Sequence, residues 1–391
     1  MKIHSINHLK KIKNQRFLVR VDFNVPLDGK RIKDDYKIAS GLETIKYLSA
    51  KGGKVIVLTH LGDPAGKVKL ALSAAPLANH LATLLKIKIK FISITVGEKV
   101  ETAISQMKPG EIIFLENVRF NPGELKNDKV FAKNLASLAD IYVNDAFAVS
   151  HRSQASVDAI KSYLPAYAGL LLEQELKALN KIVKPKKPLV VMMGGAKIET
   201  KAALIANLYS SASHILLGGG LANNFLKYKK FEIGKSLFDA GSLPVIKKLL
   251  VGRATDKKIL FPVDVIIKNR SGRIFSKKIT EVSKSDIIFD IGPETISLYA
   301  KYIKNANTII WNGPMGKFEE VHFKNGTISL ARVVAARSRG RAYGVVGGGE
   351  TVEALKMSKM MEHVDWISTA GGAMLSYLGK APMPGLKKIV S

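Results

Sequence analysis

Short apolar runs alternate along the chain with amphipathic segments, and the runs end in polar or glycine-rich turns. Four such runs with their turns span Val55 to Gly62, Ile112 to Phe120, Ile141 to Arg152 and Leu189 to Lys201. Between them, Ile38, Leu42, Ile45 and Leu48 recur at the spacing of one buried helical face. Strands that alternate with helices in this way predict parallel sheets wrapped by helices.

The run from Arg20 to Pro26 is also predicted as a strand, and it ends in a polar tip. Strand geometry places Asp22 and Asn24 on one face, whereas Phe23 and Val25 point to the opposite face and pack. Open α/β sheets bind ligands at the carboxyl ends of their strands. We therefore expect a ligand site here, although a capped strand end is the alternative for this segment taken alone.

Two lobes are expected, because 391 residues are too many for one comfortable core and the apolar fraction is 47%. The first alternation of strands and helices ends near residue 168. An amphipathic helix from Gly169 to Lys184, followed by a Lys-Pro-Lys-Lys-Pro sequence, predicts an interdomain connection over residues 169–185. A second alternation of the same kind then begins at Leu189.

The chain has no cysteine, which excludes disulfide scaffolding, thiolate catalysis and cysteine-based metal sites. His4, Lys10 and Lys11 interrupt the apolar pattern at the N-terminus, which lacks the long apolar core of a secretory signal. A cytoplasmic protein without a membrane span is expected.

The formal net charge of +29 is typical of many proteins that bind nucleic acids. Here Lys and Arg are spread in ones and twos, as at Lys10-Lys11 and Lys229-Lys230, without a basic tail or an Arg-Gly repeat. We expect a solvated surface that attracts polyanionic substrates. Specific nucleic-acid binding is not expected, but weak non-specific binding in dilute salt is.

A phosphate-binding segment is predicted where Gly194, Gly195 and Ala196 follow an apolar strand and precede Lys197 and Lys201. Lysines four apart at a helix start lie on one face near free backbone N–H groups, which suits phosphate oxygens. The alternative is a solvent-facing lysine pair. The chain has neither the Gly-x-x-x-x-Gly-Lys-Ser/Thr loop nor a dinucleotide fingerprint, so a nucleotide site must be of another design.

A second helix start follows the predicted strand Ala342 to Val346. Gly347, Gly348 and Gly349 precede Glu350 and Thr351, so that a phosphate-binding N-terminus carries a carboxylate suited to magnesium. N-terminal capping is the alternative role for Glu350.

Together with the glycine-rich segments Leu217 to Leu221, Trp311 to Gly316 and Ser368 to Ala373, these features resemble the phosphoglycerate kinase family along almost the whole chain. The resemblance implies an α/β fold of two doubly wound, Rossmann-like parallel-sheet domains joined by a long helix and hinge. It assigns acid-substrate binding to residues 1–168, with about 378–391 returning to that domain, and nucleotide binding to residues 186–377.

The resemblance also assigns individual roles. Lys201 would meet the transferring phosphoryl group, with Lys37, Gly371 and Gly372 as further catalytic positions. The acid substrate would be bound by Asp22, Phe23, Asn24, Lys37, His60, Leu61, Gly62, Asp63, Arg119 and Arg152. The nucleotide would be bound by Gly194, Gly195, Ala196, Lys197, Lys201, Gly219, Asn312, Pro314, Gly316, Glu319, Gly348, Gly349, Glu350 and Thr351.

Four positions depart from the family pattern. Lys37 and Asp63 stand where the family has arginines, Glu350 stands where it has Asp, and Ala370 replaces the first glycine of its Ser-Thr-Gly-Gly-Gly turn. Each lost guanidinium fork removes charge-assisted hydrogen bonds, worth about 1.5–3 kcal/mol each. Lys67 or Lys69 is the candidate replacement for the charge missing at position 63.

The activity implied by the resemblance is reversible phosphoryl transfer between 1,3-bisphosphoglycerate and ADP, with Mg²⁺ on the nucleotide and a monomeric protein. The attacking carboxylate or diphosphate is already an anion, so a site of lysines, arginines and helix N-termini suffices without a general base. Two alternatives remain: a nucleic-acid-binding or scaffold protein with an eroded kinase site, and a kinase for another small carboxylic acid.

Overall fold

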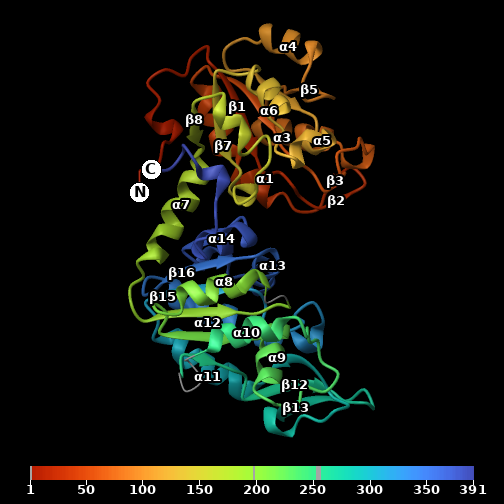
Figure 1. The fold of residues 1–391 in the computed structure, drawn as a ribbon, viewed down its shortest axis with the longest axis vertical. Coiled ribbons are helices and arrows are strands. Elements are labelled where there is room, and N and C mark those ends of the chain that lie inside the picture. Colours follow the sequence, from red (N-terminus) through yellow and green to blue (C-terminus); the bar gives the residue numbers. More distant parts are fainter. Residues whose placement is uncertain (1, 197–198, 252–256) are drawn as a thin grey trace. The chain divides into compact units, whose positions relative to one another are not determined.

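The computed structural model describes residues 2–196, 199–251 and 257–391. The chain divides into two compact units, Met1–Lys177 with Pro382–Ser391 and Ala178–Ala381, each with its own hydrophobic core (Figure 1). The two parallel sheets predicted from the sequence are confirmed, one in each unit. No helix among the described residues is long and apolar enough to cross a membrane.

The first unit contains a six-stranded parallel sheet in the order β5-β6-β4-β1-β7-β8. Its strands are β1 (Arg16–Val21), β4 (Lys54–Leu58), β5 (Lys90–Ile92), β6 (Ile112–Leu115), β7 (Ile141–Asp145) and β8 (Ala166–Ala168), and a small hairpin pairs β2 (Leu27–Asp28) with β3 (Arg31–Ile32). Its helices are α1 (Tyr36–Ser40), α2 (Leu42–Ala50), α3 (Ala75–Leu85), α4 (Glu98–Ser105), α5 (Pro122–Leu125) and α6 (Lys129–Ala136).

Helix α7 (Leu170–Val183) begins in the first unit and continues into the second. Each end of α7 lies within one residue of the corresponding end of the predicted helix. After the second unit, the C-terminal residues come back to the first. Gly385 N donates to Ser150 O over 2.8 Å, and Lys2 N donates to Ser391 O over 2.7 Å, so both chain ends lie in the first unit.

The second unit contains another six-stranded parallel sheet, in the order β11-β10-β9-β15-β16-β17. These strands are β9 (Leu189–Met193), β10 (His214–Leu217), β11 (Ile259–Leu260), β15 (Thr308–Asn312), β16 (Tyr343–Gly347) and β17 (Trp366–Ser368). A separate antiparallel sheet contains β12 (Asp264–Lys268), β13 (Ile274–Lys278) and β14 (Ile287–Ile291). The helices are α8 (Glu199–Leu208), α9 (Gly219–Tyr228), α10 (Ser242–Leu250), α11 (Pro293–Lys304), α12 (Asn325–Ser338), α13 (Gly349–Ser358) and α14 (Gly371–Leu378).

The strand predicted from Arg20 to Pro26 is wrong beyond its first two residues, because β1 ends at Val21. The Val21 carbonyl accepts from the Arg20 guanidinium and from Thr59 Oγ1, so it does not extend the ladder. Asp22 and Asn24 therefore lie in a loop. The expected alternation still holds there, since Phe23 and Val25 are buried while Asp22 and Asn24 are partly exposed.

The amphipathic helix expected over Ile38 to Leu48 is divided at Gly41 into α1 and α2. A Cβ on Gly41 would lie 2.9 Å from Cε1 of Phe23, so this close approach requires glycine. Ile38, Ile45 and Leu48 are nevertheless all buried, because the apolar spacing continues across the break.

Candidate functional site

A cationic pocket, defined here by Lys37, His60, Arg119 and Arg152, lies in the first unit in the segments that follow the ends of its strands. His60 follows β4, Arg119 follows β6 and Arg152 follows β7, while Lys37 lies on α1. Because the strands are parallel, these segments meet at one edge of the sheet, where α/β proteins bind ligands. What this cluster can bind depends on how each of its side chains is held.

His60 is almost fully buried and neutral. Burial, assisted by Arg20, Arg119, Lys37 and Arg152, holds the pKa of His60 well below its ordinary value. Arg20 Nη2 lies 3.2 Å from His60 Nδ1, and because arginine has only donors, Nδ1 accepts. The ring proton is thus assigned to Nε2. Oδ1 of Asp22 lies 3.7 Å from Nδ1, but a neutral ring does not form an ion pair with it.

Arg119 is the pocket's buried guanidinium, and its side chain is only partly paired. Its Nη1 donates to the Gly62 carbonyl over 2.7 Å. Among the described residues, the buried Nε and Nη2 have no hydrogen-bond partner. Burial lowers the pKa of Arg119, and Arg152 and Arg20 add to that effect, while Asp63 and Glu124 oppose it. A buried cation with two free donors is suited to bind an anion.

Lys37 retains a positive charge at a position where the family has arginine, but its ammonium group is bound to a carboxylate. Its Nζ donates to Asp22 Oδ2 over 2.7 Å, and both side chains are largely buried, with 30% and 9% exposed. Asn24 closes the neighbouring turn, because its Oδ1 accepts from Gly62 N over 2.9 Å. An incoming anion would compete with Asp22 for the Lys37 ammonium.

Asp63 is exposed, and its Oδ1 accepts from Ala65 N over 3.3 Å within its own turn. Its charge nevertheless raises the pKa of Arg119, so its field reaches the pocket. Arg152, Lys67 and Lys69 are exposed as well. Phe23 and Leu61, the other two positions assigned to the acid substrate in these segments, are buried, with exposures of 0% and 2%.

The second unit presents glycine-rich turns at its own switch point, between β9 and β15. Gly194 N donates to Asn312 O over 3.0 Å, and Gly195 N donates to Pro314 O over 2.8 Å, so the two turns are joined. A Cβ on Gly194 would lie 1.8 Å from the Pro314 carbonyl oxygen. Only glycine fits there, and the close backbone contact leaves room for a ligand over the turn.

The side chains of Lys201 and Glu350 both lie close to Gly195. A Cβ on this glycine would lie 3.1 Å from Lys201 Nζ and 3.8 Å from Glu350 Oε2. Lys201 is buried, and burial lowers its pKa, while the charge of Glu350 acts in the opposite direction. Lys197, the other lysine of the predicted pair, lies outside the described residues.

Two further helix N-termini face the same edge of this sheet. Helix α13 starts at Gly349, and Gly348 before it has φ of 101°, a conformation that favours glycine. Thr351 is buried, and its Oγ1 accepts from Gly313 N over 2.7 Å. Helix α14 starts at Gly371, and Gly372 is its second residue. Asn312 Nδ2 donates to Gly347 O over 2.8 Å and joins β15 to β16 at this edge.

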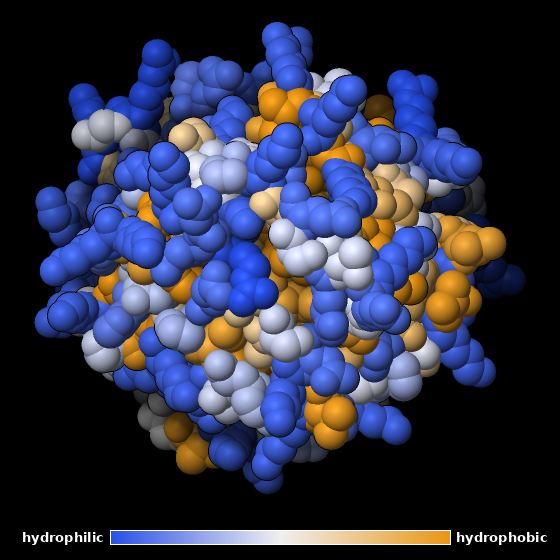
Figure 2. Space-filling view, turned by 90° about the horizontal axis from the view of Figure 1, so that it is seen from above, coloured by the Kyte–Doolittle hydropathy of each residue, from blue (hydrophilic) through white to orange (hydrophobic). Residues whose placement is uncertain are grey.

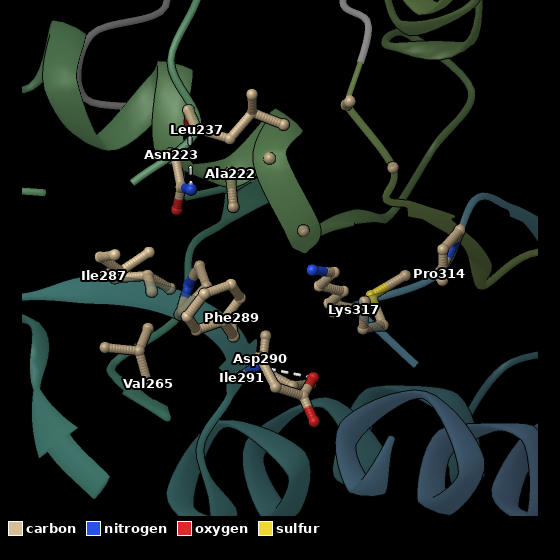
Figure 3. A pocket seen from close by; sticks show the side chains of 18 of the residues that line it. Ala222, Asn223, Leu237, Val265, Ile287, Phe289, Asp290, Ile291, Pro314 and Lys317 are labelled. Atoms are coloured by element: carbon tan, nitrogen blue, oxygen red, sulfur yellow. Dashed lines mark hydrogen bonds between the residues drawn. The ribbon is translucent and has the colours of Figure 1, made fainter. Parts of the chain in front are cut away.

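A cavity of about 340 Å³ extends from these turns (Figure 3). One end is formed by Gly195, Ala196, Gly219 and Glu350, and Pro314, Gly316 and Glu319 also line it. The other end is apolar, with Val265, Ile287 and Phe289 among its lining residues (Figure 3). Leu237 also lines the cavity, beside Gly220. A polar end and an apolar end in one cavity suit a ligand with phosphates and a flat aromatic ring.

Metal ligands are sparse in this cavity. Within residues 2–196, 199–251 and 257–391, no three His, Asp or Glu side chains are grouped to hold a metal ion. Magnesium usually keeps several waters and takes one or two carboxylates together with substrate phosphates. The exposed Glu350 therefore fits a magnesium ion that arrives with a nucleotide.

Sequence reasoning missed two buried charges at these sites. Arg20 is fully buried and donates through Nε to Ser156 Oγ, which in turn donates to the buried Glu124. Asp290 lines the cavity, and burial raises its pKa to about 7. The sequence did indicate a buried charge at Arg20, because an arginine between Val19 and Val21 in an apolar strand needs hydrogen-bonding partners. No such indication exists for Asp290, since a single acidic residue near a strand end is common.

Comparison with known proteins gives a consistent result. The family model for phosphoglycerate kinase matches residues 6–380. The chain is 41% identical over 380 residues to phosphoglycerate kinase of Moorella thermoacetica and 42% identical over 380 residues to that of Wolbachia pipientis, with 96% of each chain covered. The solved structure of phosphoglycerate kinase from Coxiella burnetii matches with a TM-score of 0.87 and 38% identity, covering 99% of both chains.

Proposed function

The chain belongs to the phosphoglycerate kinase family, and we propose how its own residues carry out the family's reaction. The enzyme is a phosphotransferase with a carboxyl group as acceptor. It transfers a phosphoryl group reversibly between 1,3-bisphosphoglycerate and ADP, giving 3-phosphoglycerate and ATP in glycolysis.

The cationic pocket of the first unit binds the three-carbon acid phosphate. The observation that carries this assignment is Arg119, whose buried Nε and Nη2 have no hydrogen-bond partner among the described residues. A phosphate or carboxylate takes both donors at once. His60 donates from Nε2 as a neutral group, and Lys37 leaves Asp22 to meet the negative charge of the substrate.

The cavity of the second unit binds the nucleotide. The base lies at the apolar end near Ile287 and Phe289, and Glu319 accepts from the ribose hydroxyls. The phosphates lie over Gly195 and the N-terminus of α13, where backbone N–H groups and the helix dipole favour anions. Magnesium comes with the nucleotide as part of the substrate, and Glu350 supplies one ligand to it, directly or through water.

Catalysis consists of positioning and charge neutralisation. The attacking group is an anion in either direction, so no side chain has to remove a proton. Lys201 and Lys37, with the N-termini of α13 and α14, stabilise the charge that spreads over the transferring phosphoryl group. Because the acid and the nucleotide bind to different units, the units close on each other during transfer and expel water.

Three further properties belong to the proposal. The protein acts as a monomer in the cytoplasm, which is the usual setting for a glycolytic enzyme. Magnesium is required as the nucleotide complex. Lys37 and Asp63 lower the affinity for the acid substrate relative to a pocket with two more arginines, because a lysine makes no bidentate fork and Asp63 adds repulsion.

A coupled assay with 3-phosphoglycerate and MgATP tests the proposal. Reduction of the acyl phosphate product by an auxiliary dehydrogenase consumes NADH, and we expect turnover that depends on both substrates. Arg119→Met and Lys201→Ala, one change in each site, should each abolish most of it. If the parent protein gave no turnover with 3-phosphoglycerate but did with another small carboxylic acid, the assignment of the acid substrate would be wrong.

A further inference from the structure

The second unit carries a cationic groove beside helices α11 and α12. Its volume is about 470 Å³, and five of its seven lining residues are Lys304, Arg332, Arg337, Arg339 and Arg341, while Val333 and Ala336 are the other two. We call these seven residues the arginine groove. Apart from Arg337, which is half-buried, its cations are exposed.

The segment between α7 and β9 adds positive charge next to this groove. Arg337 Nη2 donates to Asn307 Oδ1 over 3.4 Å, and Asn307 Nδ2 donates to the backbone carbonyl of Lys187 over 2.7 Å. Asn307 therefore places Lys186 and Lys187 beside the groove. Both of these lysines are exposed.

The groove's cations come from stretches of sequence without acidic residues. The three segments that supply them, residues 176–198, 295–318 and 321–349, contain no Asp or Glu. Among the described residues, no groove cation forms an ion pair within 4.0 Å. Asp365 contacts the start of β16, but its Oδ2 accepts from Gly344 N over 2.8 Å. The free energy of this repulsive cluster falls when it binds a polyanion.

The groove and the nucleotide cavity lie at opposite ends of the same strands. Asn307 immediately precedes β15, and Arg341 lies two residues before β16. The carboxyl ends of those two strands, at Asn312 and Gly347, belong to the nucleotide site. A ligand in the groove therefore leaves the catalytic edge free, and catalysis does not account for this concentration of arginine.

We propose that the arginine groove binds single-stranded nucleic acid through its phosphodiester backbone. Guanidinium forks pair with phosphate oxygens in two parallel hydrogen bonds. Unpaired bases can lie against the aliphatic floor of Val333 and Ala336 and against guanidinium planes, as they do in other single-strand sites. Contacts to the phosphodiester backbone carry no sequence information, so binding is independent of sequence. RNA and DNA share this backbone, and the groove accepts both.

The test compares two variants of the full-length protein with the same loss of charge. Arg332→Gln, Arg339→Gln and Arg341→Gln are combined in the groove variant. The control variant combines Arg31→Gln, Arg270→Gln and Arg273→Gln, which are exposed arginines elsewhere. Binding of labelled oligo-U and oligo-dT is measured by anisotropy over a range of salt concentrations, together with a duplex of equal length and vesicles of anionic lipid.

The groove variant should lose at least tenfold in affinity for both oligonucleotides. Its slope of log K against log salt should fall by about 2, because each single-strand phosphate contact contributes about 0.7. The control variant should keep the parental slope, and both should keep parental kcat and KM for 3-phosphoglycerate and ATP. Equal losses in the two variants, an unchanged slope in the groove variant, or tighter binding of duplex or vesicles than of single strands would each overturn the proposal.

Discussion

Replacing Arg119 with methionine should make the protein more stable and the enzyme nearly inactive. In the free protein the buried Nε and Nη2 are unpaired among the described residues, and each buried unpaired donor costs about 1–3 kcal/mol. Methionine removes both donors and fills similar volume. The change also removes the charge-assisted bond from Nη1 to Gly62 O, worth about 1.5–3 kcal/mol. The net gain should be about 1 kcal/mol.

The same two donors set the expected loss in catalysis. If the acid substrate takes both of them, Arg119→Met removes two charge-assisted hydrogen bonds, or about 3–6 kcal/mol of binding free energy. Because about 1.4 kcal/mol corresponds to a factor of ten, kcat/KM for 3-phosphoglycerate should fall by about 10² to 10⁴. Arg119→Lys keeps the positive charge but not the bidentate guanidinium, so its kcat/KM should lie between those of the parent and the methionine variant.

Urea unfolding and steady-state kinetics measure the two effects separately. Arg31→Met, a change at an exposed arginine of the same unit, is the control and should alter neither quantity by much. Nucleotide affinity should also stay at the parental value in Arg119→Met. A methionine variant that unfolds more easily than the parent and retains its KM for 3-phosphoglycerate would refute the reasoning, because Arg119 would then be a structural residue.

Four further outcomes are expected. Lys201→Ala should lower kcat by about 10² to 10³ while calorimetry shows nearly unchanged nucleotide affinity, because its charge acts mainly in the transition state; a parental kcat would contradict this. Asp63→Arg should lower KM for 3-phosphoglycerate, and Lys37→Arg should raise kcat. If Asp63→Arg left this KM unaltered, we would assign the role of position 63 to Lys67 or Lys69 instead. Burial raises the pKa of Asp290 to about 7, so the folded state holds this proton more tightly and the free energy of unfolding falls as the pH rises through that value. Asp290→Asn should reduce that fall between about pH 4 and pH 7 in urea titrations, and an identical pH dependence would exclude Asp290 as a contributor. Finally, solution scattering should show a smaller radius of gyration with 3-phosphoglycerate and nucleotide together than with either alone, and an equal radius in all states would exclude closure.

Much of the fold was predictable because the apolar periodicity of this chain is regular. The alternation of strands and helices predicted two parallel sheets, and both are present. The errors fall where a side chain replaces a backbone partner. Thr59 Oγ1 and the Arg20 guanidinium bond to the Val21 carbonyl and end β1 there, and the contact of Gly41 with Phe23 divides α1 from α2. The contacts of Thr59 with Val21 and of Gly41 with Phe23 join residues 38 and 18 positions apart, so no pattern within either segment indicates them.

The candidate sites were predictable as segments but not as geometry. Glycines after strands pointed to the turns at Gly194 and Gly348, because only a few residue types tolerate such close backbone approach. Sequence could not show that Lys37 donates to Asp22, that His60 is held neutral, or that Asp63 is exposed in its own turn. These facts depend on which charges are brought together from distant segments, and that follows only from the packed structure.

The neutral His60 shows how a strongly cationic pocket stays folded without its substrate. Four cations act on the pKa of this ring, and a fifth charge on the almost fully buried His60 would add repulsion among them. Arg20 prevents this by occupying Nδ1 as a donor, and its own charge is balanced through Ser156 by the buried Glu124. The remaining cations, Arg119, Arg152 and Lys37, have only Asp22 as a close partner among the described carboxylates. Under the proposed function, the negative charge of the acid substrate would offset the repulsion among these cations, and part of the substrate's affinity would come from that relief.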